Sequence, residues 1–138
     1  MEICLPYLTE TTAYFGLPLT NSGDEQIKLE SVKVTDSSNL ASPTLSLDSE
    51  PDSVGAYSLP DSPSEFELPG LRSRVENSAP IESATIDKNS FSTLLIGMVP
   101  IDKDRDADIT RLEIRYLESG KERTLEQSVR FVATASEC

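Results

Sequence analysis

A strict alternation of apolar and polar residues near the carboxyl end constrains the fold more than any other feature of the chain. Leu112, Ile114 and Tyr116 alternate with charged residues, and this period of two places apolar side chains on one face of a β-strand. A helix through residues 109–117 is the alternative, but the strict period and the β-compatible side chains favour the strand. A second predicted strand follows, with four apolar residues on one face: Leu125, Val129, Phe131 and Ala133.

The connection between these two strands has two readings. A four-residue loop over residues 119–122 sets Arg115 opposite Glu126, so that opposite charges meet across the pair. A two-residue turn of Ser119 and Gly120 would instead set Glu113 opposite Glu126, where like charges are adjacent. We therefore predict the four-residue loop.

The amino-terminal part has a similar pattern. Residues 13–21 and 27–34 read as two strands, and the Gly- and Asp-containing segment 22–25 between them predicts a β-hairpin. Apolar residues occupy odd positions at the start of the second strand and even positions at its end, so a β-bulge near Ser31 would turn them all to the core. A further apolar strand is predicted over residues 91–100.

The central region, residues 36–89, is dense in Ser, Pro, Asp and Glu. Proline cannot donate to a sheet ladder and confines strands to edges. One interpretation is a flexible or partly disordered surface excursion. A structureless loop of this length is unusual within a compact domain, however. We therefore expect short edge strands in three places: around Leu45 and Leu47, around Phe66 and Leu68, and from Arg72 to Val75.

Short strands separated by turn signals, without a long helical period, predict an all-β chain that forms one domain over residues 1–138. The segments L-P-L-T-N-S-G-D-E-Q-I-K-L and L-E-I-R-Y-L-E-S-G-K-E-R-T-L resemble immunoglobulin-like or fibronectin-like modules. The resemblance implies an antiparallel β-sandwich with a long central excursion, of the kind found as accessory domains in bacterial envelope and secreted proteins. The chain departs from that class because it has no Trp and neither Cys stands at the inter-sheet bridge position.

Residues 102–113 resemble an EF-hand-type calcium loop in residue type. Carboxylates stand at the first, third, fifth, seventh and twelfth places, whereas the sixth place has Ala107 where the pattern needs Gly. The alternative is a solvated turn between strands, partly neutralised by Lys103 and Arg105. Calcium is the one cofactor that the sequence suggests, and its five candidate metal ligands are Asp102, Asp104, Asp106, Asp108 and Glu113.

The charge balance limits the partners. The chain has 12 basic and 24 acidic residues, a net charge of -12, which repels nucleic acid and anionic membrane surfaces. The acid is most simply explained by solubility, with a cationic partner or bound divalent ions as the alternatives. No apolar run is long enough to cross a bilayer, and the first residues lack the features of a signal peptide.

The two cysteines, Cys4 and Cys138, stand at the extremes of the chain. A bridge between them would close nearly the whole chain and add about 4 to 5 kcal/mol in the loop-entropy model. If the first and last strands run parallel, however, the start of one and the end of the other lie at opposite poles, beyond disulfide reach. We therefore expect two free thiols, with a bridge as the alternative.

Catalysis has little support in the sequence. The chain contains no His, so Ser–His and Cys–His arrangements are absent, and its six Gly residues do not form a phosphate-binding loop. A small carboxylate-dependent hydrolase is the weakest alternative. We expect a non-catalytic interaction or structural module in the cell envelope or secreted, whose leader or anchor is absent from the given sequence. Its partner would be an unidentified protein or envelope polymer, docked through an edge strand or polar loops, and a calcium-binding module is the alternative.

Overall fold

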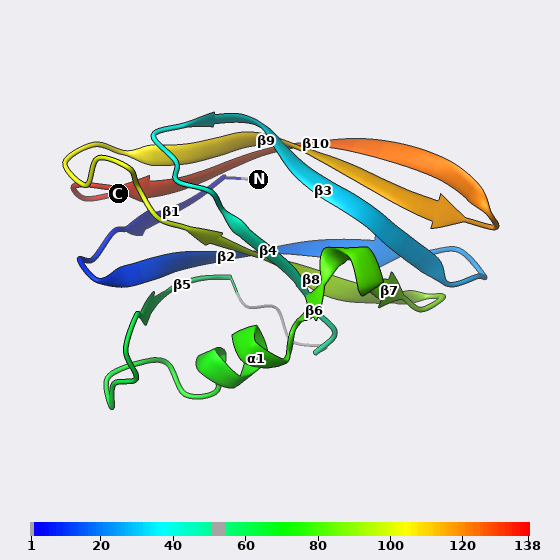
Figure 1. Ribbon diagram of the computed structural model, residues 1–138, viewed down its shortest axis with the longest axis horizontal. Coiled ribbons are helices and arrows are strands. Elements are labelled where there is room, and N and C mark those ends of the chain that lie inside the picture. Colours follow the sequence, from blue (N-terminus) through cyan, green and yellow to red (C-terminus); the bar gives the residue numbers. More distant parts are fainter. Residues whose placement is uncertain (1, 51–54) are drawn as a thin grey trace.

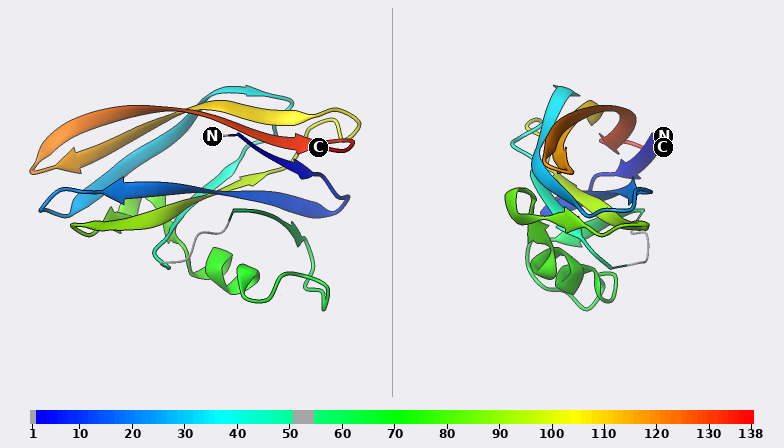
Figure 2. Two further views of the ribbon diagram at one scale, coloured as in Figure 1. Left: turned by 180° about the vertical axis from the view of Figure 1, so that it is seen from behind. Right: turned by 90° about the vertical axis from the view of Figure 1, so that its right-hand side faces the viewer.

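Two five-stranded β-sheets pack face to face in the computed structural model, which describes residues 2–50 and 55–138 (Figures 1 and 2). The elements in chain order are β1 (Glu2–Pro6), β2 (Thr11–Asn21), β3 (Ile27–Ser38), β4 (Thr44–Asp48), β5 (Ala56–Pro60), α1 (Leu71–Asn77), β6 (Ala79–Pro80), the 3-10 helix η1 (Ile81–Ser83), β7 (Thr85–Ile86), β8 (Ser90–Met98), β9 (Ala107–Glu118) and β10 (Lys121–Thr134). The first sheet has the order β1-β10-β9-β3-β7 and the second has the order β5-β2-β8-β4-β6. The prediction of an all-β sandwich is confirmed.

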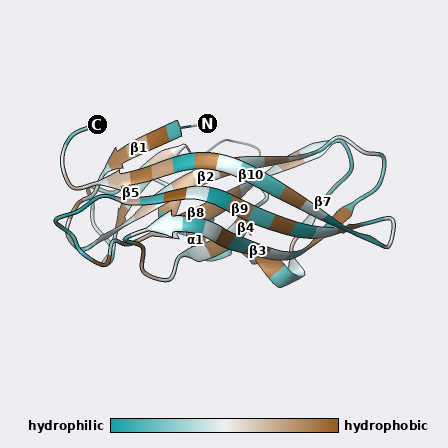
Figure 3. Ribbon diagram, turned by 90° about the horizontal axis from the view of Figure 1, so that it is seen from above, coloured by the Kyte–Doolittle hydropathy of each residue, from teal (hydrophilic) through white to brown (hydrophobic). Residues whose placement is uncertain are grey.

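The core lies between the two sheets, where the alternation of the strands brings their apolar rows together. Along β9, Ile109, Leu112 and Ile114 are buried while charged neighbours face solvent, a pattern visible as alternating colours along the ribbon in Figure 3. Phe15 of β2 and Phe131 of β10 cross the space between the sheets and stack with their ring centroids 5.2 Å apart. Both rings are fully buried, so this contact joins the two layers at the centre of the core.

The first two long strands do not form the predicted hairpin. β2 pairs with β5 and β8, whereas β3 pairs with β7 and β9 in the opposite sheet. The turn of residues 22–26 therefore carries the chain from one sheet to the other. Asn21 supports this crossing, because its side-chain amide donates to the carbonyl oxygens of Glu25, Ile86 and Asp87 at 2.7, 3.1 and 3.2 Å. A Gly- and Asp-rich turn signals a change of direction and not which strand the chain pairs with next.

The predicted bulge in β3 is confirmed. Leu29 pairs with Tyr116 and Ser31 pairs with Arg115, so β3 has one residue more than β9 at this point. The extra residue, Glu30, lets the apolar positions on both sides of it face the core.

The turn between β9 and β10 is the two-residue alternative, and the predicted four-residue loop is wrong. Ser119 and Gly120 have φ angles of 52° and 76°, the paired positive values of a type I′ turn, whose twist matches that of the flanking strands. Lys121 consequently pairs with Glu118, and Glu126 pairs with Glu113. The repulsion between the half-buried Glu113 and the exposed Glu126 costs about 0.2–1 kcal/mol, and the twist preference of the backbone turn prevails over it.

The central region is mostly ordered around the second sheet, although residues 51–54 lie outside the described part. The strand expected around Leu45 and Leu47 is present as β4. Phe66 and Leu68 lie in an exposed loop and not in a strand. The strand expected from Arg72 to Val75 is also wrong, because these residues belong to α1.

Helix α1 covers the outer face of the second sheet, as the views in Figures 1 and 2 show. Leu71 and Val75 are one helical turn apart, and both pack in a small cluster with Leu95 of β8. An ion pair of 2.6 Å between Arg74 and the nearly buried Asp48 ties the helix to β4. This burial of one helix face against the sheet is why the segment is helical.

A disulfide joins Cys4 and Cys138, whose Cα atoms are 6.0 Å apart, so the expectation of two free thiols is wrong. β1 and β10 do run parallel, but β1 is short and lies against the last five residues of β10, with Cys4 beside Val132. After β10 ends at Thr134, four residues suffice to bring Cys138 back to β1. The two ends of the chain thus lie on one edge of the sandwich (Figure 2).

Replacing both cysteines by Ser should lower the free energy of unfolding by up to about 5 kcal/mol, because the bridge closes a loop that spans almost the entire chain. Denaturant unfolding of the double variant and of oxidised wild type measures the difference. The two single Ser variants should lose as much as the double variant, and wild-type stability in the double variant would contradict the bridge.

Candidate functional site

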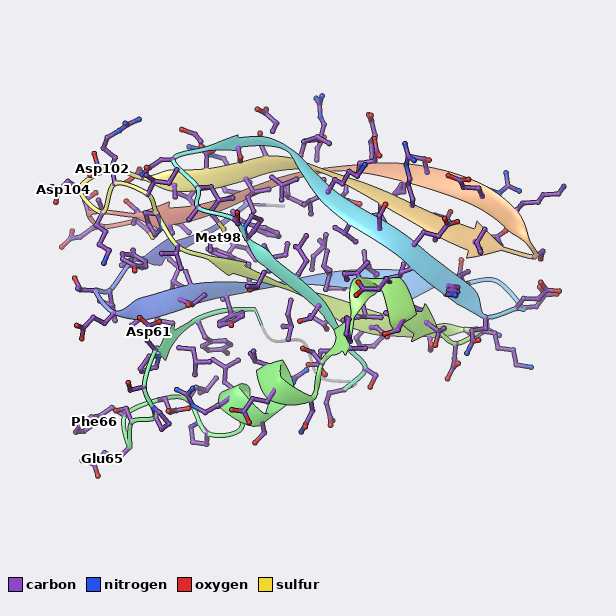
Figure 4. The ribbon with its side chains drawn as sticks, viewed as in Figure 1. Asp61, Glu65, Phe66, Met98, Asp102 and Asp104 are labelled. Carbon is purple, nitrogen blue, oxygen red and sulfur yellow. A yellow bond between two sulfur atoms is a disulfide. The ribbon has the colours of Figure 1, made fainter. Side chains whose placement is uncertain are left out.

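The acidic loop between β8 and β9 is organised by Asn39 and not by its own carboxylates. The Asn39 amide nitrogen donates to the carbonyl oxygens of Asp102, Arg105 and Asp106 at 2.8, 3.0 and 3.3 Å, and its side-chain oxygen accepts from the Asp102 N–H at 2.8 Å. Figure 4 shows Asp102 and Asp104 at the end of the sandwich, in the loop itself. The Asp102 carboxylate accepts from the Asp104 N–H at 3.0 Å, which forms a local turn.

Asp106 has a structural role at the same end of the molecule. Its Oδ1 accepts hydrogen bonds from the Ala135 N–H and from the Thr134 hydroxyl, both at 2.9 Å. These two donors, the backbone N–H first, hold the pKa of Asp106 below its ordinary value. The carboxylate thus fastens the segment that leads from β10 to Cys138.

The structure does not bring the five predicted calcium ligands together. Asp108 and Glu113 lie within β9, and Glu113 is seven residues beyond Asp106, roughly 23 Å along an extended strand. Glu113 instead pairs with Arg115 at 3.1 Å. Over residues 2–50 and 55–138, no group of three or more His, Cys, Asp or Glu side chains is placed to hold a metal ion.

The edge of the first sheet is a further candidate site, because β10 is only partly covered there. β1 pairs with residues Arg130 to Thr134 of β10, and on the side away from β9 no described strand lies beside residues 121–128. None of these eight residues is Pro, so each retains its N–H group. Glu118 and Lys121 form the pair that closes the two-residue hairpin. By alternation, therefore, every second N–H points away from β9, at Glu122, Thr124, Glu126 and Ser128.

The facing edge of the second sheet is closed to pairing in a different way. β5 covers β2 only from Thr11 to Phe15. The Gly16 N–H donates to Gly55 on the β5 side at 2.7 Å, so the nitrogen of Pro18, two residues later, faces the same side and has no hydrogen to donate. Proline on an exposed edge prevents strand addition. Of these two edges, only that of β10 keeps the N–H donors of all its uncovered residues.

A groove of about 390 Å³ lies between these two edges, at the end of the sandwich opposite the acidic loop. Core side chains form its floor, among them Leu29 and Ile114, and Pro18 and Gln127 lie along its sides. Leu125 also lines the groove and is 43% exposed, although it stands opposite the buried Ile114 and so faces the interior of the sandwich. β1 covers residues Arg130 to Thr134 of β10 but does not reach Leu125, so this core-facing leucine stays exposed.

The side chains of the uncovered β10 segment are sorted by face. Leu125 and Gln127 stand opposite the buried Ile114 and Leu112, so they face the groove. Glu122 and Glu126 alternate with them and face outward. Glu118 is the one carboxylate among the described residues that line the groove, so they provide no carboxylate pair for acid–base chemistry. The lining combines core apolar side chains with polar ones such as Asn21 and Gln127.

The groove was not predicted from the sequence, because its presence depends on where the strand next to β10 ends. The alternation of apolar residues placed Leu125 on the core face, which is confirmed by its pairing with Ile114. Its exposure arises because β1 is only five residues long, and the length of a neighbouring strand is not encoded in β10 itself. Pro18 was the available signal, since Pro within a strand marks an edge.

Comparisons of this chain with models of known protein families, with curated proteins and with solved structures find no match. Among the helices that the structure describes, none has the length and apolar character needed to cross a membrane.

Calcium should leave the melting temperature unchanged, because the five candidate carboxylates are spread over a loop and a strand. Thermal melts at millimolar calcium and with a chelator test this. A site at a calcium concentration 100 times its dissociation constant would add about 2.7 kcal/mol, which such melts resolve. A calcium-dependent rise in the midpoint that is lost in Asp102→Asn would restore the metal hypothesis.

Asp106→Asn should lower the melting temperature by a few degrees at neutral pH. The folded-state pKa of Asp106 is depressed, so its stabilisation is present above the unfolded pKa and is lost as the pH falls through the folded pKa. The difference from wild type should therefore shrink as the pH is lowered below about 4.

Asp104→Asn is the matched control for this titration, since the Asp104 carboxylate accepts no hydrogen bond from the described residues. A pH-independent difference for Asp106→Asn, or an equal effect of Asp104→Asn, would contradict the role assigned to Asp106.

Proposed function

We propose that this protein is a non-catalytic, extracytoplasmic interaction module that docks an extended segment of a partner protein onto the uncovered edge of β10. The observation that carries the proposal is the coincidence of an unpaired strand edge, residues 121–128, with a groove beside it in which core side chains such as Leu29, Ile114 and Leu125 are reachable. A partner strand would receive main-chain hydrogen bonds from the edge and place alternate side chains in the groove.

The proposal includes an immunoglobulin-like class for the sandwich. In that class one sheet has the order A-B-E-D and the other consists of C, F and G. The order β5-β2-β8-β4 corresponds to the first sheet and β10-β9-β3 to the second, with β9 and β10 as the F–G hairpin. The chain differs in that β5, which takes the place of strand A, follows β4 along the chain, and in its Cys4–Cys138 bridge.

The outward-pointing N–H groups make strand addition to β10 favourable. Glu122, Thr124, Glu126 and Ser128 alternate along the edge and provide donors over a length of about 20 Å. A partner strand there would also cover Leu125, removing an exposed core-facing leucine from water. Both effects favour an extended chain over a folded surface as the ligand.

The compartment is inferred from the disulfide. A bridge that joins the first strand to the end of the chain is stable where the surroundings are oxidising, as in the periplasm, the cell surface or the extracellular medium. The non-catalytic assignment is supported by the absence of His from the sequence and by the single carboxylate in the groove lining.

A neutral seven-residue peptide that alternates Thr and Val should bind to residues 121–128. In ¹⁵N–¹H correlation spectra, the amide shifts should be concentrated on that segment and on the groove lining. Thr124→Pro should abolish them, because Pro removes an outward-pointing N–H without removing a bond to β9. Thr124→Ala is the matched control and should bind as wild type does.

Peptide-induced shifts confined to the loops at the opposite end of the sandwich would refute the proposed function. So would retention of full binding by a folded Thr124→Pro protein, whose fold is checked from its amide spectrum and melting temperature.

A further inference from the structure

We infer that the segment docked on β10 is cationic, with basic residues alternating with apolar ones along the strand. This inference rests on the proposed function and specifies the partner of the same edge. It follows from the charges on the outward face of the uncovered part of β10, where Glu122 and Glu126 lie, whereas Lys121 and Arg123 alternate with them and lie on the opposite face.

On the outer face of the edge two carboxylates lie opposite each other, and only one of them has cations of the protein nearby. Glu126 stands directly opposite Glu113 on β9. Glu113 has cations nearby, because Arg115 lies 3.1 Å away and Lys33 is its Cα partner on β3. For Glu126 the described residues provide no ion pair. A cation on the other side of Glu126, where a docked strand would lie, would compensate its charge.

A second carboxylate lies on the same face of the same edge. Glu122 is four residues from Glu126, so both point outward from β10. Its only ion pair within the described residues is a long one, 3.9 Å to Arg115, which Glu113 also shares. Opposing residues on adjacent strands share a face, so the partner residues opposite Glu122 and Glu126 would be basic.

The groove face sets the intervening positions. The partner residue opposite Leu125 would enter the groove beside Pro18 and Leu19, and an apolar side chain suits it. The residue opposite Arg123 would lie at the open end of the groove over Tyr116, the Cα partner of Arg123. The pattern on the docked strand is thus basic, apolar, any, apolar, basic. It reads the same in both directions, so it does not depend on the direction in which the strand docks.

The charge of the whole molecule favours this partner over a second copy of the chain. A net charge of -12 attracts a cationic segment and repels an identical molecule. In a symmetric pairing of two β10 edges centred on Leu125, Glu126 would meet Thr124 of the other copy and Glu122 would meet Ser128. Neither contact compensates a carboxylate.

Two seven-residue peptides with blocked ends test the inference. One has Lys at positions 2 and 6, Val at positions 3 and 5 and Thr elsewhere, and the other has Glu in place of both Lys. Affinities come from titrations followed in ¹⁵N–¹H spectra at 50 mM and 500 mM salt. We expect the Lys peptide to bind at least tenfold more tightly at low salt, and the preference to fall at high salt because the charges are exposed.

Exchange of the charges on β10 gives the sharper test. The double variant Glu122→Lys and Glu126→Lys should lose the preference for the Lys peptide and gain one for the Glu peptide. The double variant Asp61→Lys and Glu65→Lys is the matched control. Asp61 and Glu65 lie in an exposed segment at the opposite end of the molecule (Figure 4), so their replacement changes the net charge equally but leaves the edge intact.

The outcomes separate this inference from the proposed function. If both peptides bind wild type equally and Thr124→Pro abolishes both, strand docking stands and the cationic partner is refuted. If sedimentation shows wild type to self-associate through a contact that Thr124→Pro disrupts, the occupant is a second copy and the inference is likewise refuted. If neither peptide binds, both proposals fail.

Discussion

The register between β9 and β10 is the constraint on which the remainder of the structure depends. A turn of two residues with positive φ fixes Lys121 opposite Glu118, and every later pairing in the hairpin follows from that start. It decides which side chains of β10 enter the core and which N–H groups face outward. A slip of one residue would turn Leu125 to the solvent and the carboxylates to the interior, so the groove and the charge pattern of the edge share one origin.

The uncovered edges of β2 and β10 differ in what limits their pairing with a further strand. On β2, Pro18 removes the donor that a new strand would need. On β10 the protection consists of charged side chains, which discourage indiscriminate pairing but leave the main chain able to pair. An edge whose pairing is limited only by charged side chains is selective, because charge repulsion does not act on a strand of complementary charge.

Local patterns predicted the strands well and their neighbours poorly. The apolar run of residues 91–100 located β8, and the period of two located β9 and β10. The change of parity near Ser31 located the bulge, because burial of one face acts on each strand separately. Whether residues 22–26 return the chain to the same sheet depends on the whole topology, which is why the hairpin prediction failed. Charge pairing also misled the choice of turn at Ser119, since exposed ion pairs are weaker than the twist preference of the backbone.

For the candidate sites too, local sequence patterns located the segments but not the residues that contact them. The spacing of carboxylates from Asp102 to Glu113 matched a calcium loop, but the strand that begins at Ala107 extends the chain and carries Glu113 away. Asn39, which fastens that loop, is 63 residues from Asp102 in sequence, and no local signal announces it. The groove beside Leu125 depends on the length of β1, a strand at the other end of the chain.

The bridge between Cys4 and Cys138 also determines how the molecule would respond to tension. A pull applied to the two ends would reach the sulfur atoms first and pass between them, because almost the whole chain lies inside the ring that they close. The strands of the sandwich would bear little of the load while the bridge is intact. The sandwich would therefore keep its shape under forces that would extend one held by hydrogen bonds alone.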